Sequence, residues 1–184
     1  RTTYTINVNP IPSFSKNPTN KSICADDGED NLTTLSGVTV SNGSPVWYNA
    51  QTGGSKVNAA DIVNGGTYWV AAENATTGCK NATRKQFVLT VNPRPVEPTF
   101  DEIDAQCGSY TLPTKDKNQV SVNWYTAATG GNKITSVTNS GTYYAEAVNA
   151  NNCTSASRTP VQITINTKPT ITASKTSCAP YEEI

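Results

Sequence analysis

The chain has 184 residues, of which 14 are basic and 14 acidic, and it contains neither histidine nor methionine. A formal net charge of zero gives no electrostatic attraction to nucleic acid, and no apolar run is long enough to cross a membrane. Without histidine the chain lacks the usual base of nucleophilic triads and a common ligand of catalytic metals, so we expect no enzyme and no cofactor.

Three similar segments recur along the chain. They are RTTYTINVNP from Arg1, RKQFVLTVNP from Arg84 and RTPVQITINT from Arg158. Apolar side chains occupy alternate positions in all three, which is the period of a strand with one face in a core. No helical period is sustained anywhere. The sequence therefore predicts an all-β protein that is built from a repeated domain.

Two further blocks recur between these strands. VWYNAQTGGSKV from Val46 matches VNWYTAATGGNKI from Val122, and GGTYWVAAENATTGC from Gly65 matches SGTYYAEAVNANNC from Ser140. The predicted organisation is the closing strand of a preceding repeat (1–10), a full domain (11–92), a second full domain (93–167) and the start of a following repeat (168–184). Proline restricts the backbone at the junctions, so we expect short semi-rigid linkers and an extended rod.

Each predicted domain carries one cysteine near its start and one after its tyrosine-rich strand. The pairs are Cys24 with Cys79 and Cys107 with Cys153. Domains of this size bury a limited core, and a disulfide is a common remedy in secreted proteins. Two thiols per domain without histidine are too few for a zinc site, so we predict one intradomain disulfide in each domain. Cys178 takes the early position of the following repeat.

Alternation also predicts an aromatic pair on the outer face of each domain. If Trp47 and Tyr68 point into the core, the residues that follow them point outward, and the second domain repeats the pattern. The four candidates are Tyr48, Trp69, Tyr125 and Tyr144. Such a pair is either a platform on which a sugar ring stacks or a cross-strand contact that stabilises the sheet. We favour the structural interpretation.

The chain offers one weak candidate for a metal site. An acidic cluster surrounds Gly28 and consists of Asp26, Asp27, Glu29 and Asp30. Carboxylate oxygens suit Ca²⁺, but the spacing differs from an EF-hand loop and the second domain has no counterpart, so a solvated loop is the preferred interpretation.

Other candidates for chemistry are weaker. Glu73 has no carboxylate at the matching position of the second repeat, which argues against a repeated pair of catalytic carboxylates. The sequence TGG recurs in both domains, but a predicted helix follows neither copy. It therefore indicates a glycine-rich strand connection and not a phosphate loop.

These blocks resemble immunoglobulin domains. Trp47 and Trp124 look like the tryptophan that fills an immunoglobulin core from strand C, and SGTYYA from Ser140 looks like the signature of strand F. One departure is the second cysteine, which lies farther on, at the turn into the last strand. The resemblance therefore implies a bridge from the hairpin between strands F and G to the start of strand B.

The combination of WY, TGG, GTYY, a cysteine and a closing strand is similar to the immunoglobulin-like repeats of very large Bacteroidetes surface proteins, which include the mobile adhesins of gliding bacteria. The resemblance implies tandem immunoglobulin-like β-sandwiches, type IX secretion, an extracellular location at the outer membrane, and a non-catalytic stalk or spacer that leaves adhesive contacts open. The partners it implies are neighbouring repeats, surface glycans or secretion components. Similar repeats also accompany catalytic domains of secreted polysaccharide-degrading enzymes, so a spacer or carbohydrate-binding module is the alternative.

Overall fold

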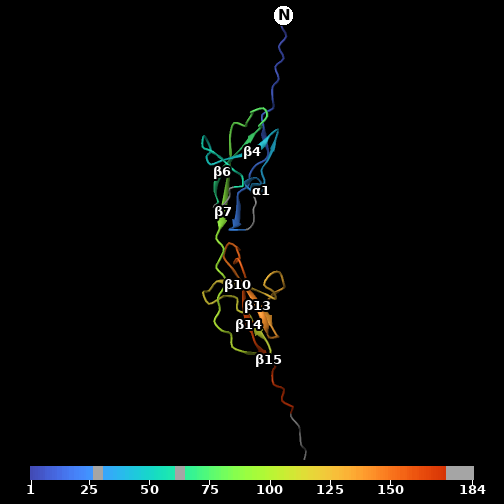
Figure 1. Cartoon of the computed structure of the whole chain (residues 1–184), viewed down its shortest axis with the longest axis vertical. Helices are drawn as coiled ribbons and strands as arrows, with labels where there is room; N and C mark the ends of the chain where they lie inside the picture. The colour runs from blue at the N-terminus through green and yellow to red at the C-terminus, as the bar shows by residue number, and fades with distance from the viewer. Residues whose placement is uncertain (27–30, 61–64, 173–184) are drawn as a thin grey trace, which may run out of the picture. The chain divides into compact units, whose positions relative to one another are not determined.

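The structure is a computed structural model that describes residues 1–26, 31–60 and 65–172. It divides into two compact units, Arg1–Arg94 and Pro95–Ile184, which are described separately as the first and the second domain (Figure 1). Strands predominate among the described residues, and the one helix there, α1 (Leu32–Ser36), has 5 residues. The all-β prediction is therefore confirmed. No helix in the described part of the chain is long and apolar enough to cross a membrane.

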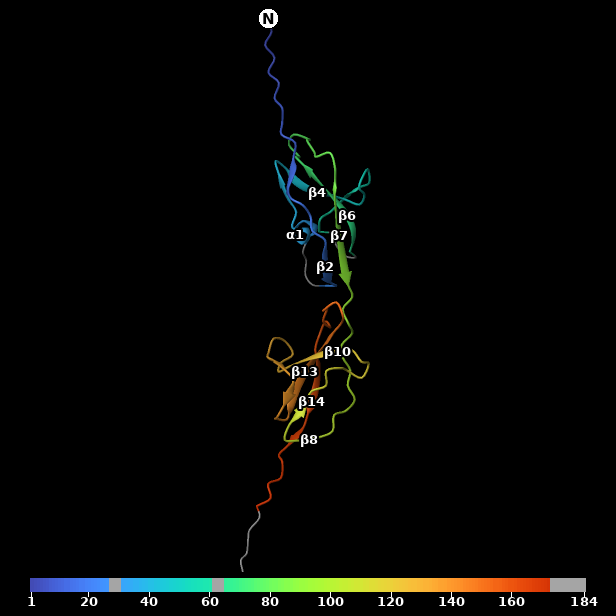
Figure 2. The same ribbon diagram turned by 180° about the vertical axis from the view of Figure 1, so that it is seen from behind.

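The larger sheet of the first domain has five strands in the spatial order β2-β7-β6-β4-β5. They are Lys21–Cys24 (β2), Lys85–Asn92 (β7), Gly66–Glu73 (β6), Ser44–Tyr48 (β4) and Lys56–Val57 (β5). β2 runs parallel to β7, beside which it lies in Figure 2, and the other neighbours are antiparallel. The alternation predicted for β7 is present, because Phe87 and Leu89 are buried while Gln86 and Thr90 are exposed.

A second layer covers the apolar face of this sheet. It consists of α1 and a smaller sheet, in which β1 (Ser13–Lys16) pairs with β3 (Thr39–Ser41). Leu32 of α1 and Trp47 of β4 belong to one buried cluster, against which Phe14 of β1 packs. The indole Nε1 of Trp47 donates a hydrogen bond to Thr33 Oγ1 at 3.0 Å, which joins the sheet to α1. The two layers form a β-sandwich whose centre is a buried tryptophan.

Local sequence accounts for the short helix. The Asn31 side chain caps its start by accepting a hydrogen bond from the Thr34 amide at 3.0 Å. Gly37 ends it with a φ of 62°, a left-handed conformation that glycine adopts without steric cost. α1 is thereby limited to little more than a turn, which is enough to place Leu32 over the sheet.

The second domain is built in a similar way. Its main sheet has the strand order β11-β10-β13-β14. These strands are Lys133–Ile134 (β11), Ser121–Tyr125 (β10), Gly141–Val148 (β13) and Thr159–Ile163 (β14). Two short sheets complete the domain: β8 (Gln106–Cys107) runs parallel to β15 (Ile165–Asn166), and β9 (Tyr110–Thr111) pairs with β12 (Ser136–Val137).

Trp124 plays the part in the second domain that Trp47 plays in the first. It is 3% exposed and lies in a cluster with Leu112, which directly follows β9, and with Ile163 of β14. Its Nε1 donates to the Pro113 carbonyl at 2.7 Å, and its ring lies 4.9 Å from that of Phe100. The two tryptophans predicted from sequence thus fill the two cores.

The predicted intradomain disulfides are wrong. Cys79 and Cys107 are free thiols, whereas Cys24 and Cys153 are disulfide-bonded. Each predicted pair therefore contains one cysteine that is free, and neither Cys24–Cys79 nor Cys107–Cys153 forms.

Strand pairing gives the physical reason. Cys24 ends β2 opposite Asn92, at the end of β7, whereas Cys79 lies beyond the far end of β6, where its carbonyl accepts from the Asn74 amide. An eight-residue strand such as β6 spans roughly 20 Å or more, while a disulfide needs Cα atoms within about 7 Å. In the second domain Cys107 pairs with Asn166 at one end, and Cys153 follows β13 at the other.

The first ten residues form no strand. The apolar side chains of their alternating pattern, those of Tyr4, Ile6 and Val8, are 84%, 85% and 88% exposed, although the equivalent side chains of β7 are buried or partly buried. Their assignment to a preceding repeat stays a prediction, as does the extended rod.

Candidate functional site

The outer face of each main sheet carries the predicted aromatic pair. In the first domain Trp47 lies in the core, and the next residue, Tyr48, lies on the opposite face, where its cross-strand partner is Trp69 of β6. In the second domain Tyr125 of β10 is opposite Tyr144 of β13. The sequence therefore predicted correctly that these residues are neighbours on one face.

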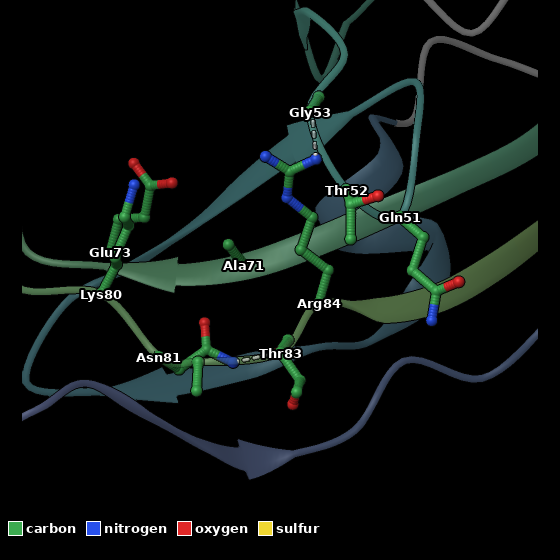
Figure 3. A pocket seen from close by; sticks show the side chains of 10 residues that line it. Gln51, Thr52, Gly53, Ala71, Glu73, Lys80, Asn81, Thr83 and Arg84 are labelled. Carbon is green, nitrogen blue, oxygen red and sulfur yellow. Dashed lines mark hydrogen bonds between the residues drawn. The ribbon is translucent and has the colours of Figure 1, made fainter.

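An arginine that sequence reasoning gave no role covers Tyr48. The guanidinium carbon of Arg84 lies 3.3 Å from the Tyr48 ring centroid. Its Nη1 also donates to the carbonyls of Ala50 and Gly53 at 2.6 and 2.7 Å. Arg84 thus stacks on the ring and holds the loop between β4 and β5, as its reach toward Gly53 shows in Figure 3. Tyr48 is only 7% exposed as a result.

The second domain repeats this arrangement. The guanidinium carbon of Arg158 lies 3.4 Å from the Tyr125 ring centroid. Its Nη1 donates to the carbonyls of Ala127 and Gly130 at 2.9 and 2.6 Å, in the loop between β10 and β11. We call the arginine, the tyrosine and the loop that the arginine holds the arginine clamp.

The TGG sequence shapes the loop that the clamp holds. Gly53 and Gly54 have φ of 61° and 65°, and Gly130 and Gly131 have φ of 63° and 71°. A Cβ on Gly54 would lie 2.4 Å from Asn49 Oδ1, so only glycine fits there. The loop joins two antiparallel strands, β4 and β5, as predicted for a glycine-rich strand connection. Because its carbonyls face the guanidinium, the loop serves the clamp and not a phosphate.

A partly buried carboxylate completes each clamp. The Tyr48 hydroxyl donates to Glu73, whose other oxygen accepts from Lys56 Nζ at 3.1 Å. The Tyr125 hydroxyl donates to Glu146 at 3.2 Å, and Arg158 Nε donates to the same carboxylate at 3.3 Å. The side chains of Glu73 and Glu146 are 17% and 16% exposed, so the two carboxylates are similarly shielded.

These contacts shift the acidities of the groups. Burial raises the pKa of Tyr48 and of Tyr125, and the neighbouring carboxylate adds to the effect in each case. Burial alone would also raise the pKa of Glu73, but hydrogen bonds from Tyr48 and Lys56 outweigh it and lower that pKa. The tyrosines therefore stay neutral hydrogen-bond donors and Glu73 stays ionised, which suits a structural network and not proton transfer at neutral pH.

The sequence alignment places no carboxylate opposite Glu73 in the second domain. In the structure, however, Glu146 of the second domain takes the same role as Glu73, because it also accepts a hydrogen bond from the tyrosine of its clamp. Glu73 aligns with Val148, and Glu146 aligns with Ala71. The two glutamates lie two positions apart along the equivalent strand, which keeps both on the outer face because side chains alternate. Each reaches the tyrosine of its own clamp.

The first domain has a pocket next to the strand position at which the second domain carries its glutamate (Figure 3). The small side chain of Ala71 stands where the second domain has Glu146, and a pocket of about 280 Å³ opens between Ala71, Arg84 and Glu73. Lys80 and Asn81 also line it, so its wall combines polar and apolar groups. Among the described residues no carboxylate pairs with Arg84, in contrast to Arg158 with Glu146.

The clamp decides which aromatic surface is accessible. Tyr48 was expected to be exposed on the outer face, but Arg84 covers it, so its ring offers no free platform. Arg158 covers Tyr125 in the same way, and that tyrosine is only partly exposed. Trp69 and Tyr144 remain partly exposed and are the two candidates that a ligand can still reach. Their role as ligand-facing residues stays a prediction.

One sequence signal for the clamp was present. Each of the three similar segments begins with arginine, at Arg1, Arg84 and Arg158. An arginine that recurs just before an alternating strand in every copy points to a shared contact, although its partner lies more than thirty positions earlier in sequence, as the Arg84–Tyr48 contact shows.

Most of the calcium candidate lies outside the described residues. The structure does not describe Asp27, Glu29 and Asp30. It does describe Asp26, which has a φ of 60° and whose backbone carbonyl accepts a hydrogen bond from Arg94 Nη2 at 3.4 Å. No group of histidine, cysteine or acidic side chains in the described part of the chain is arranged to hold a metal ion.

Comparison with known proteins identifies the domain type. A family model described as an Ig-like domain, CHU_C associated, matches residues 11–93 and again residues 95–169. No curated protein is similar enough in sequence to match. A solved structure of SGBP-B from the mixed-linkage glucan utilization locus of Bacteroides ovatus, in complex with a mixed-linkage heptasaccharide, is 17% identical with a TM-score of 0.29. That alignment covers 85% of this chain and 48% of the other, so this chain spans about half the length of that protein.

Proposed function

Because the chain belongs to the family of CHU_C-associated Ig-like domains, with two immunoglobulin-like β-sandwiches in tandem, we propose that it is a non-catalytic segment of a large secreted surface adhesin. In this proposal the domains are stalk or spacer modules that sit outside the cell. Their immediate partners are the neighbouring repeats of the same chain.

One observation carries the proposal: the polar and aromatic groups that the two domains share on their outer faces bind to each other. The guanidinium groups of Arg84 and Arg158 stack on a tyrosine ring and donate hydrogen bonds to loop carbonyls of the same domain. A binding module would keep such groups free for its ligand, as sugar-binding sites present an open aromatic face and a few convergent polar groups. The feature that recurs in this repeat therefore serves the stability of the module, which is what a stalk requires.

A second function has one observation in its favour. The pocket beside Ala71 in the first domain is partly open and is lined by polar as well as apolar groups, and it contains a guanidinium without a carboxylate partner among the described residues. This favours a carbohydrate-binding spacer next to the catalytic domain of a polysaccharide-degrading enzyme.

Binding to a panel of polysaccharides tests the two functions. The wild-type chain is compared with a double variant, Trp69→Ala with Tyr144→Ala, which removes the accessible aromatic rings. We expect no specific binding by the wild type and a modest loss of stability in the variant, about 0.2 to 1 kcal/mol for each cross-strand contact.

The stalk proposal would be wrong if the wild type bound a polysaccharide specifically and the double variant, while still folded, did not bind it. The chain would then be a binding module. A third variant, Lys80→Ala, distinguishes the pocket from the aromatic face, because Lys80 lines the pocket and takes no part in the arginine clamp. The sequence that flanks the chain in the full-length protein provides an independent test: many further copies favour the adhesin, and an adjacent catalytic domain favours the alternative.

A further inference from the structure

The clamp arginines of the two domains differ at one edge of the guanidinium group. In the second domain Arg158 Nε donates to Glu146 at 3.3 Å, and the tyrosine hydroxyl of the clamp donates to the same carboxylate. In the first domain Arg84 Nη1 holds the two loop carbonyls in the same way, but Nε has no acceptor among the described residues. The Nε edge of Arg84 is therefore available to a ligand.

The strand register shows what is missing in the first domain. Ala71 pairs with Val46, the residue before the core tryptophan of β4, and Glu146 pairs with Asn123, the residue before the core tryptophan of β10. Ala71 and Glu146 thus occupy the same position of the repeat. The alanine side chain offers no acceptor, and the pocket of about 280 Å³ lies beside it. The first domain has space where the second domain has a carboxylate.

The pocket suits a negatively charged group. Three charged side chains line it, namely those of Arg84, Lys80 and Glu73, so positive charge is in excess. Glu73 already accepts a hydrogen bond from Lys56 Nζ at 3.1 Å. Lys80 is exposed and forms no ion pair within the described part of the chain. Ala71 lies between Lys80 and Arg84 in Figure 3, so an anion above it would be attracted by both cations.

We propose that this pocket binds the carboxylate of a glutamate or aspartate side chain from an acidic peptide segment of a partner protein. The carboxylate accepts a hydrogen bond from Arg84 Nε, as Glu146 accepts one from Arg158, and Lys80 adds a second positive charge. The site goes beyond the stalk role and does not depend on it. It gives the first domain a contact point that the second domain lacks, because Glu146 already fills the equivalent position there.

The lining favours a peptide carboxylate over an acidic sugar. None of the ten residues that line the pocket is aromatic, although sugar-binding sites present an open aromatic face. The nearby Tyr48 ring is covered by the Arg84 guanidinium at 3.3 Å. In the second domain, the group that takes the corresponding position is itself a glutamate side chain. The occupant with the best precedent in this fold is therefore an acidic amino acid.

A nuclear magnetic resonance titration of the ¹⁵N-labelled chain tests the proposal. The probe is the capped tripeptide alanyl-glutamyl-alanine amide, and its matched control contains glutamine in place of glutamate. We expect saturable shifts of the Arg84 Nε–H signal and of backbone amides in 51–53 and 80–84, which line the pocket. The glutamine peptide should bind about tenfold more weakly or less, because it lacks the charge. Absence of saturable shifts, or equal affinity for the two peptides, would overturn the proposal.

Three variants localise the binding. Ala71→Glu supplies a carboxylate of the domain's own beside Arg84 and should abolish binding. Lys80→Ala removes the second cation and should weaken binding of the glutamate peptide. Lys85→Ala removes an exposed charge outside the pocket and should leave the affinity unchanged. Undiminished binding by Ala71→Glu with its amide spectrum otherwise intact would refute the site, and the wild-type titration does not depend on how any variant folds.

Trigalacturonate, an acidic oligosaccharide, is the competing probe. Tighter binding of trigalacturonate than of the glutamate peptide at the same residues would overturn the peptide assignment and favour the carbohydrate-binding alternative. If neither probe binds, the acidic-peptide site is refuted while the stalk is unaffected. Specific polysaccharide binding that depends on the aromatic face, together with peptide binding in the pocket, would refute the stalk and leave this site in place.

Discussion

The guanidinium group of Arg158 stacks on the ring of Tyr125 at 3.4 Å, and the same arginine binds two carbonyls of the loop that follows this tyrosine. The equivalent arginine and tyrosine in the first domain, Arg84 and Tyr48, repeat the contact at 3.3 Å. A planar group that stacks and donates in a fork at the same time is a property of arginine that lysine lacks. The arginine clamp is therefore sensitive to a change that conserves charge.

Replacement of Arg84 by lysine should destabilise the first domain. Lysine keeps the positive charge but loses the stacking and at least one of the two carbonyl contacts, so we expect about 1 to 3 kcal/mol less free energy of unfolding. Hydrogen exchange of the whole chain, followed by mass spectrometry, assigns the loss to a domain. Lys85→Ala, at the exposed neighbouring position, is the control and should change stability by less than about 0.5 kcal/mol. Equal effects of the two changes would contradict the clamp.

The two glycines of the TGG loop should differ in their tolerance of alanine. Both have positive φ, but a Cβ on Gly53 meets nothing within 4 Å, whereas one on Gly54 meets Asn49 Oδ1 at 2.4 Å. We expect Gly53→Ala to cost about 1 to 2 kcal/mol from the left-handed backbone alone, and Gly54→Ala to cost about 1 to 3 kcal/mol more from overpacking. Thermal unfolding measures the difference. Gly130 and Gly131 form the matched pair in the second domain, and a reversed order in either pair would refute this account.

Loss of the Glu146 carboxylate should weaken the second clamp. Glu146→Ala removes the acceptor of the Tyr125 hydroxyl and the partner of Arg158 Nε. Because both donors are largely buried, we expect a loss of about 1 to 3 kcal/mol, visible as faster hydrogen exchange in β10 and β13. Glu102→Ala removes an exposed carboxylate of the same domain and serves as the control. An unchanged exchange rate in Glu146→Ala would show that the carboxylate contributes nothing.

Asp116 should make the second domain sensitive to acid. Its Oδ1 accepts from the amides of Asn118 and Val120 at 2.9 Å each, and its Oδ2 accepts from Thr99 at 3.2 Å. Burial of the carboxyl would raise its pKa, but these backbone hydrogen bonds outweigh burial and lower it from 3.8. On acidification the unfolded chain therefore binds the proton first. The contribution of Asp116 is complete above about pH 4 and is lost as the pH falls through the lowered pKa.

Asp116→Asn provides the measurement for that prediction. The variant should be less stable at neutral pH by about 1 to 3 kcal/mol, because an amide replaces an acceptor of backbone N–H groups. Its stability should also fall less between pH 5 and pH 2 than that of the wild type. Asp101→Asn, at a side chain that is 86% exposed, should keep the wild-type pH dependence. Parallel acid profiles for Asp116→Asn and the wild type would contradict the assignment.

The sequence by itself determined the fold class and the face on which each strand residue lies. Alternation assigned Trp47 and Trp124 to the cores, and it assigned Tyr48 with Trp69 and Tyr125 with Tyr144 to the outer faces, where they are cross-strand partners. Repetition made these assignments firm, because the same pattern of apolar positions occurs in both domains. Such predictions succeed because side-chain direction in a strand depends only on local backbone geometry.

Only the tertiary structure decided which residues meet along and between strands. The parallel pairing of β2 with β7 sends Cys24 to the end of the sheet opposite Cys79, and this rules out the disulfide that sequence order favoured. In the same way, the position along the strand, and not the alignment, brings Glu73 to Tyr48 and places Arg84 over that ring. Alternation has a period of two, so it determines the face of the sheet on which a residue lies but not which residue of the neighbouring strand lies opposite it. The register of strand pairing determines which residues lie opposite each other, and this register depends on contacts between segments that are far apart in the chain.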